Sequence, residues 1–118
     1  NNENAIKLKR QYLSRLKSQF TTKETKITSS NKTILKDYLQ LAIDLELNVK
    51  FNYHKSVQFD GGIKSLRTIK PKGFKVLGQY NSLCVFGYCY MREEERTFNL
   101  DRISELVINP KTIEFWTE

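Results

Sequence analysis

The chain has 118 residues, of which 39% are hydrophobic, and it carries a formal net charge of +7. This length excludes a second domain of ordinary size, and the hydrophobic content excludes a chain that is disordered throughout. No apolar run approaches the roughly 20 residues of a membrane-spanning helix, and the polar residues 1–4 contain no signal-peptide core, so a cytoplasmic protein with no membrane partner is expected.

The positive charge is concentrated at the start of the chain. Residues 1–36 hold nine Lys or Arg against two Glu, whereas residues 37–118 hold eleven of each sign. Clustered cations favour a polyanionic partner through counterion release, although a basic surface can also be merely solubilising. Because the chain does not begin with Met, and Met91 is its single methionine, we also expect it to be a fragment of a larger protein.

Residues 1–30 are predicted to form a basic helical segment and a linker. Apolar residues recur every three or four positions between Ala5 and Phe20, as in an amphipathic helix. Residues 21–31 are polar and lack periodicity, which predicts a linker.

A second helix is predicted over residues 31–47, at the start of a domain that spans residues 31–118. Ser30 or Asn31 can cap its first turn, and the helix should end near residues 46–48. Its predicted apolar stripe consists of Ile34, Tyr38, Leu41, Ala42 and Leu45.

The periodicity changes from helical to alternating at Val49, so residues 48–118 are predicted to form a small antiparallel barrel. After a first strand at residues 49–53, further strands are expected at residues 66–70, 73–77, 83–90, 96–100 and 105–108, with an edge strand at 112–116. The predicted fold class is therefore mainly β with N-terminal helices, an α+β arrangement.

No motif in the chain predicts catalysis or a bound cofactor. Cys84 and Cys89 have an odd separation, so in a strand they face opposite sides roughly 17 Å apart and remain free thiols. They cannot complete a zinc site around His54, the single histidine. An alternative is a small metal-dependent nuclease that uses the Glu run at residues 93–95 with Asp101.

Several segments, in order and spacing, resemble the WYL domain family over residues 39–108. The matching runs are LAIDLELNVKFNY at 41–53, RTIKP at 67–71, the apolar strand at 83–90 and RTFNLDRI at 96–103. The longer run at 87–103 resembles WYL domains attached to bacterial helicases and exonucleases. The tripeptide that names the family falls at residues 83–85, where Leu-Cys-Val keeps the apolar strand but has neither the Trp nor the Tyr.

The resemblance implies a five-stranded Sm-like or SH3-like barrel preceded by a helix, with a basic groove for nucleic acid or another anion. Such modules accompany helix-turn-helix domains in transcription regulators and occur at the C-terminus of Pif-type DNA helicases. We therefore expect a non-catalytic regulatory module that binds single-stranded DNA or other nucleic acid, as an accessory domain of a helicase. The alternatives are a ligand-sensing effector domain of a transcription regulator and a protein-interaction adaptor.

The candidate ligand contacts are basic or aromatic. Arg67, Arg96 and Arg102 match basic positions of the family motif, and a guanidinium offers a planar fork of donors suited to phosphate. Arg102 can instead pair with Asp101. Tyr53 can stack on a base or serve as a core tyrosine with a satisfied hydroxyl. Weaker electrostatic contributions are expected from Lys70, Lys72 and Arg92.

Overall fold

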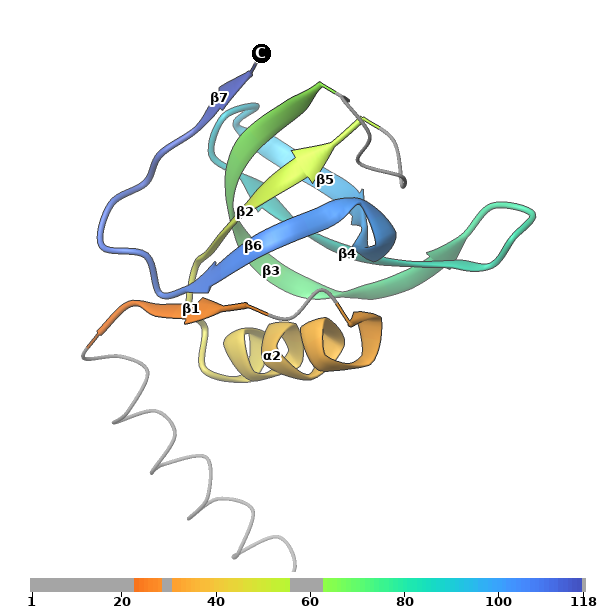
Figure 1. Cartoon of the computed structure of the whole chain (residues 1–118), viewed down its shortest axis with the longest axis horizontal. Coiled ribbons are helices and arrows are strands. Elements are labelled where there is room, and N and C mark those ends of the chain that lie inside the picture. The colour runs from red at the N-terminus through yellow and green to blue at the C-terminus, as the bar shows by residue number, and fades with distance from the viewer. Residues whose placement is uncertain (1–22, 29–30, 56–62, 118) are drawn as a thin grey trace, which may run out of the picture.

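The computed structural model describes residues 23–28, 31–55 and 63–117, and within them the protein is mainly β (Figure 1). The predicted helix between Ala5 and Phe20 lies outside the described residues. The elements are β1 (Thr25–Ile27), α2 (Lys32–Asp44), β2 (Val49–His54), β3 (Lys64–Leu77), β4 (Ser82–Cys89), β5 (Glu94–Asn99), a 3₁₀ turn η1 (Leu100–Arg102), β6 (Ile103–Ile108) and β7 (Trp116–Thr117). None of the described helices is long and apolar enough to span a bilayer.

The strands form one antiparallel seven-stranded sheet in the order β1-β6-β2-β3-β4-β5, and β7 pairs with the start of β3. A closed barrel requires the first and last strands to pair. Among the described residues, β5 pairs only with β4 and β1 only with β6, so the sheet curls round its interior but stays open (Figure 1). The predicted closed five-stranded barrel is therefore wrong in strand number and in closure.

Part of the predicted linker is a strand. Thr25–Ile27 pairs with β6 in the register Thr25 to Ile108 and Ile27 to Leu106, and it buries Ile27. Three residues are too few to show the alternation by which strands are recognised in a sequence. Their pairing depends on the exposed edge of β6, which is distant in the chain.

Helix α2 confirms the predicted second helix, but its buried face is turned slightly from the predicted stripe. The Asn31 side chain accepts hydrogen bonds from the backbone N–H groups of Thr33 and Ile34, at 2.9 and 3.3 Å, and so caps the first turn. Ala42 and Leu45 are buried as predicted, whereas Leu35 and Leu39 are buried in place of their neighbours Ile34 and Tyr38. Tyr38 and Leu41 pack partly against the core, and Ile34 is exposed. Adjacent apolar pairs at 34–35, 38–39 and 41–42 gave two possible stripes.

The end of α2 is fixed by two backbone hydrogen bonds. The Glu46 N–H donates to the Ile43 carbonyl at 3.2 Å and the Leu47 N–H donates to the Ala42 carbonyl at 2.9 Å. This is a Schellman arrangement, in which the residue after the cap takes a left-handed conformation. Glu46 has φ of 57°, so a residue with a side chain occupies a position that favours glycine.

The two strands predicted at residues 66–70 and 73–77 are one long strand. The first part of β3 pairs with β2, and the part from Ile69 pairs with β4, with a register shift between Pro71 and Gly73. Proline cannot donate to a sheet ladder, so a bulge at Pro71 lets the strand continue. Gly87 lies opposite on β4, where an added Cβ would be 2.2 Å from the Lys70 carbonyl oxygen.

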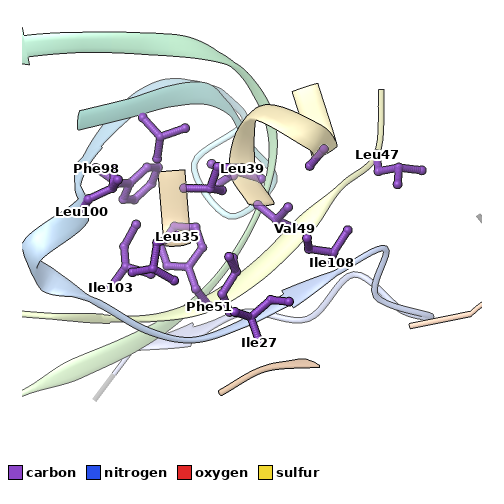
Figure 2. Packing of buried hydrophobic residues seen from close by; sticks show 14 of the residues in the cluster. Ile27, Leu35, Leu39, Leu47, Val49, Phe51, Phe98, Leu100, Ile103 and Ile108 are labelled. Atoms are coloured by element: carbon purple, nitrogen blue, oxygen red, sulfur yellow. The ribbon is translucent and has the colours of Figure 1, made fainter. Parts of the chain in front are cut away.

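Helix α2 and the inner face of the sheet share one hydrophobic core (Figure 2). Alternation along β2 directs Val49 and Phe51 inward, where Phe51 meets the edge of Phe98 with ring centroids 5.3 Å apart. Leu35 and Leu39 cover these rings from the helix side, as Figure 2 shows. Burial of these side chains holds the curled sheet and the helix together.

Both cysteines are buried, free thiols on opposite faces of β4, as predicted. Cys89 belongs to the core, whereas Cys84 lies on the other face opposite Asn99. Burial raises the pKa of the Cys84 thiol above its ordinary value; Asp101 reinforces the shift and Lys75 opposes it. A thiol in this setting stays protonated and unreactive near neutral pH.

Candidate functional site

A pocket of about 210 Å³ opens where β2 ends and β3 begins. In Figure 1 this end of the sheet faces away from α2. The lining residues come from β2, β3, η1, β7 and the residues that flank positions 56–62; they are Tyr53, Lys55, Ile63, Lys64, Ser65, Arg67, Arg102 and Thr117.

Strand alternation explains why a basic pocket continues the apolar core. Tyr53 follows Val49 and Phe51 on the inner face of β2. Arg67 lies opposite Phe51 in the antiparallel register, and Ile69, two residues further along β3, is buried. The inner face therefore changes from hydrophobic to polar side chains as it leaves the helix and reaches the open end.

Tyr53 forms a fixed wall of this pocket. Its ring packs edge-to-face on Phe98, with centroids 5.0 Å apart, and on Phe51, with centroids 6.2 Å apart. Its hydroxyl accepts a hydrogen bond of 3.0 Å from the Asn99 N–H. The side chain is thus a half-buried tyrosine with an engaged hydroxyl, and the ring is held in one orientation.

Arg102 lies over that ring. Its guanidinium carbon is 4.4 Å from the Tyr53 centroid, a cation–π contact, and its Nε–H donates to the His54 carbonyl at 2.6 Å. The alternative pairing with Asp101 is not formed, because Asp101 pairs with Lys32 at 3.1 Å. The terminal nitrogens of Arg102 make no hydrogen bond or ion pair with any described residue, which leaves them for a ligand.

Arg67 enters the same pocket from the opposite strand. Its Nε–H donates to the Ser65 hydroxyl at 2.9 Å, and its guanidinium carbon lies 6.0 Å from the Phe98 centroid. As with Arg102, a bond through Nε fixes the plane of the guanidinium and keeps its terminal donors available. The site thus contains two oriented donor forks on an aromatic wall.

The electrostatics of the pocket favour an anion. Lys55, Lys64, Arg67 and Arg102 contribute four cations, and no Asp or Glu occurs among the described residues that line it. A concave site lined by one sign of charge concentrates the opposite ion. Phosphate suits this donor set because guanidinium groups bind its oxygens in pairs.

The structure brings together three of the seven predicted contacts, Tyr53, Arg67 and Arg102. The other four lie outside the pocket lining. Arg96 is on β5 and pairs with Glu94 at 3.2 Å, and Lys72 pairs with Glu95 at 3.7 Å. Lys70 is exposed on β3, and Arg92 is exposed in the turn before β5.

Sequence reasoning did not assign Lys55, Lys64, Ser65 or Thr117 to the site. A signal existed for the lysines, because the basic residues between Lys50 and Lys75 are interrupted by a single acid, Asp60. The contribution of Thr117 depends on the pairing of β7 with β3, which local sequence does not reveal.

Three of the four acidic residues of the nuclease alternative are engaged in ion pairs. Glu94, Glu95 and Asp101 each pair with a lysine or arginine, at 3.1 to 3.7 Å. Across the ranges that the structure describes, no three His, Cys, Asp or Glu side chains are grouped as metal ligands would be.

Comparison with known proteins gives the family. The WYL domain matches residues 35–108, well over half of the chain, and the protein therefore belongs to the WYL domain family. The matched region contains Tyr53, Arg67 and Arg102 but ends before Thr117.

The fold also resembles a solved structure, the proteasome accessory factor B/C (PafBC) of Arthrobacter aurescens. The TM-score is 0.54 at 20% sequence identity, over 70% of this chain and 12% of that one. The chain thus corresponds to about an eighth of the PafBC chain. No curated protein matches the sequence.

Proposed function

We propose that this WYL domain is a non-catalytic regulatory module that binds single-stranded nucleic acid in the pocket of Tyr53, Arg67 and Arg102. The observation that supports this most strongly is the convergence of two oriented guanidinium groups on one aromatic wall, without an acidic residue in the described lining. A backbone phosphate accepts hydrogen bonds from the terminal nitrogens of both arginines.

The size of the pocket indicates how much of a strand enters it. Pockets that enclose a whole small ligand usually measure roughly 300–1,000 Å³. A pocket of about 210 Å³ therefore accepts one phosphate and part of its nucleoside, while the flanking nucleotides lie outside. Recognition of this kind reads the backbone rather than the base sequence.

We propose further that the module serves a DNA helicase in cis, in the bacterial cytoplasm. This rests on the run at residues 87–103, which resembles WYL domains of helicases. A module that holds the released single strand would bias the direction or processivity of an attached motor. Helicase motifs encoded ahead of residue 1 would support the link, and a winged-helix sequence there would overturn it.

The four cations that line the pocket also fit a second candidate, in which the phosphate of a free nucleotide is bound and the module is an effector domain of a regulator. The two candidates differ in how the affinity depends on the number of linked nucleotides. If AMP displaces a labelled oligonucleotide at a concentration similar to that of unlabelled oligonucleotide, the pocket is a nucleotide sensor. A requirement for several linked nucleotides supports strand binding.

Fluorescence anisotropy with labelled oligo(dT) tests the site. Arg67→Ala should weaken binding by about 1.5–3 kcal/mol, the range for a hydrogen bond to a charged group. Arg96→Ala is the matched control, because it removes the same side chain from β5, outside the pocket. Affinity should also fall with salt, with a log–log slope of about 0.7 for each phosphate neutralised. Equal losses for the two variants would reject this pocket as the binding site.

The non-catalytic assignment has its own test. The protein is incubated with labelled oligonucleotide and Mg²⁺, and the products are separated by size. We expect no cleavage above that of buffer. Cleavage that disappears when any residue of the Glu run at 93–95, or Asp101, is replaced by its amide would establish the nuclease alternative instead.

A further inference from the structure

The outer face of β3 and β4 carries a second group of basic and aromatic residues. Lys70 is three positions from Arg67 in a regular part of β3, so the two side chains point to opposite faces of the sheet. Lys70, Lys72 and Lys75, here called the lysine row, are all exposed. None of them lines the pocket. In Figure 1, β3 and β4 continue side by side beyond the body of the sheet to their connecting turn.

Aromatic rings lie beside this row on β4. Tyr88 is opposite Lys70 in the register and has 36% of its surface exposed. It meets Tyr90 edge-to-face with centroids 5.2 Å apart, and the Tyr90 hydroxyl donates to the Asn48 amide oxygen at 2.9 Å. This edge-to-face contact with Tyr90 holds the Tyr88 ring in place, while part of the Tyr88 ring stays exposed to solvent.

A glycine fixes the third aromatic side chain. Gly73 is opposite Phe86, and a Cβ on Gly73 would lie 3.0 Å from two carbons of the Phe86 ring. The ring therefore covers the bare backbone of β3, as aromatic residues do beside a strand glycine. The Lys75 ammonium lies 4.7 Å from the centroid of this ring. Phe86 thus positions Lys75 on the outer face.

The charge of the row is only partly neutralised. Lys72 pairs with Glu95 at 3.7 Å, and both side chains are about half exposed, so this pair is weak. Lys70 and Lys75 take part in none of the ion pairs between described residues. Lys70 thus lies opposite the exposed Tyr88 ring, and Lys75 lies over Phe86, the next aromatic ring along this face of β4.

We propose that the lysine row and Tyr88 form a second contact surface for single-stranded nucleic acid, on the face of the sheet opposite the pocket. Lysines neutralise successive phosphates and a base stacks on Tyr88, the combination by which single strands are held without regard to sequence. An acidic peptide would satisfy the lysines but has no base to stack on the exposed ring. Nucleic acid is therefore the partner that fits both features.

Two surfaces on opposite faces have a consequence for strand length. A short oligonucleotide occupies one surface at a time, whereas a longer one can pass round an edge of the sheet and occupy both. The second contact is then intramolecular and raises the affinity by an effective-concentration gain. Affinity should rise more steeply with length than the number of added phosphates alone predicts.

The test measures anisotropy of fluorescein-labelled oligo(dT) of 20 nucleotides on the full chain. The double variant Lys70→Gln, Lys75→Gln is compared with Lys36→Gln, Lys111→Gln, which removes the same charge from exposed positions elsewhere. We expect the first pair to weaken binding at least fivefold more than the control and to reduce the salt slope by about 1.4, at about 0.7 per phosphate. Equal effects would overturn the proposal.

The stacking role is tested with Tyr88→Phe and Tyr88→Leu. Phe keeps a planar ring and should bind normally, whereas Leu should lose about fivefold or more, the lower end for one stacked base. Circular dichroism confirms that each variant is folded. Equal binding by Phe and Leu variants, or binding of a fluorescein-labelled poly-Glu 20-mer with higher affinity than oligo(dT), would contradict the proposal.

Failure of this surface and failure of the pocket give different results. In an Arg67→Ala, Arg102→Ala background, residual binding of the 20-mer should persist and should depend on Lys70 and Lys75. If the pocket variants bind normally and the lysine variants do not, only the second surface is a site. If residual binding is unchanged by the lysine replacements, the second surface is rejected whatever the pocket does.

Discussion

The guanidinium of Arg102 stacks on the ring of Tyr53 at 4.4 Å, while the Tyr53 hydroxyl accepts a hydrogen bond from the Asn99 N–H at 3.0 Å. The ring and the hydroxyl of one side chain therefore have different partners. The ring holds the guanidinium of Arg102, a proposed ligand contact, and the hydroxyl anchors the end of β5.

Replacement of Tyr53 should separate these two roles. Tyr53→Phe keeps the ring and leaves the Asn99 N–H unsatisfied, so it should cost about 1–3 kcal/mol of stability with little loss of affinity. Tyr53→Leu also removes the cation–π contact, and oligonucleotide binding should weaken by a further amount of about 0.5–2 kcal/mol. Thermal melts and anisotropy on the same samples measure both effects. Equal affinity of the two variants would show that the stack does not position Arg102.

Gly87 should be intolerant of any side chain. A Cβ there would lie 2.2 Å from a backbone oxygen, which moves only if β3 and β4 separate. We expect Gly87→Ala to cost about 3 kcal/mol, at the upper end for overpacking. At Gly73 the contact is with the Phe86 ring, which can turn, so Gly73→Ala should cost about 1 kcal/mol. Urea denaturation measures the loss of unfolding free energy in each variant. A larger loss for Gly73→Ala than for Gly87→Ala would contradict this explanation.

Glu46 should be improved by glycine. Its φ of 57° is a left-handed conformation that an L-residue adopts at a cost, and Glu46→Gly should stabilise the fold by about 0.5–1 kcal/mol after the larger entropy of the unfolded glycine is deducted. Lys36→Gly, at an exposed position inside α2, should have the opposite sign and cost about 1 kcal/mol. Chemical denaturation at one pH measures the free energy of unfolding of both variants. If Glu46→Gly is also less stable than the wild type, the backbone at Glu46 is not strained.

The raised pKa of the Cys84 thiol predicts that the fold becomes less stable at alkaline pH. Its pKa is raised in the folded state, so the unfolded chain releases this proton first as the pH rises. The free energy of unfolding should therefore decline above a pH of about 8.5, the ordinary thiol value. Denaturation with reductant at pH 7.5 and 9.5 should show a larger decline for the wild type than for Cys84→Ala. An identical decline in the wild type and in Cys84→Ala would mean that this thiol does not contribute to the pH dependence of stability.

Thr68 should control the attachment of the C-terminal segment. Its buried hydroxyl donates to the Glu114 carbonyl at 2.6 Å and accepts from the Glu114 N–H at 3.2 Å. Thr68→Val leaves both groups unpaired, so exchange of the backbone amide hydrogens of residues 114–117 should accelerate. Because Thr117 lines the pocket, affinity should also fall. Thr112→Val, which removes an exposed local hydrogen bond, is the control.

Most of the fold between residues 48 and 108 could be predicted because the strands are short runs rich in apolar and β-branched residues, separated by recognisable turns. Prediction failed where local pattern does not determine structure. Pro71 and Gly73 suggest a break in the sequence, whereas β3 passes through them with a bulge because it has a partner on each side. Closure of the barrel depends on whether β5 meets the far edge of the sheet, and no single segment carries that information.

The lining of the candidate pocket could be predicted from the sequence only in part, for a related reason. Arg67 and Arg102 belong to recognisable runs, and both reach the pocket. Arg96 belongs to the same run as Arg102 but lies on β5, where it pairs with Glu94. Lys55 and Lys64 lie on opposite sides of a hairpin connection, and they line one pocket only because β2 and β3 pair in a particular register.

Strand β1 completes the sheet by pairing Thr25 with Ile108, positions about eighty residues apart. Contacts between such distant positions form late in folding, because the chain between them must first be ordered. The three residues of β1 also form few hydrogen bonds, so this strand should open before the rest of the sheet does. Each opening uncovers the edge of β6, and an uncovered edge can pair with a strand from another molecule. The short first strand thus protects the protein against association through β6.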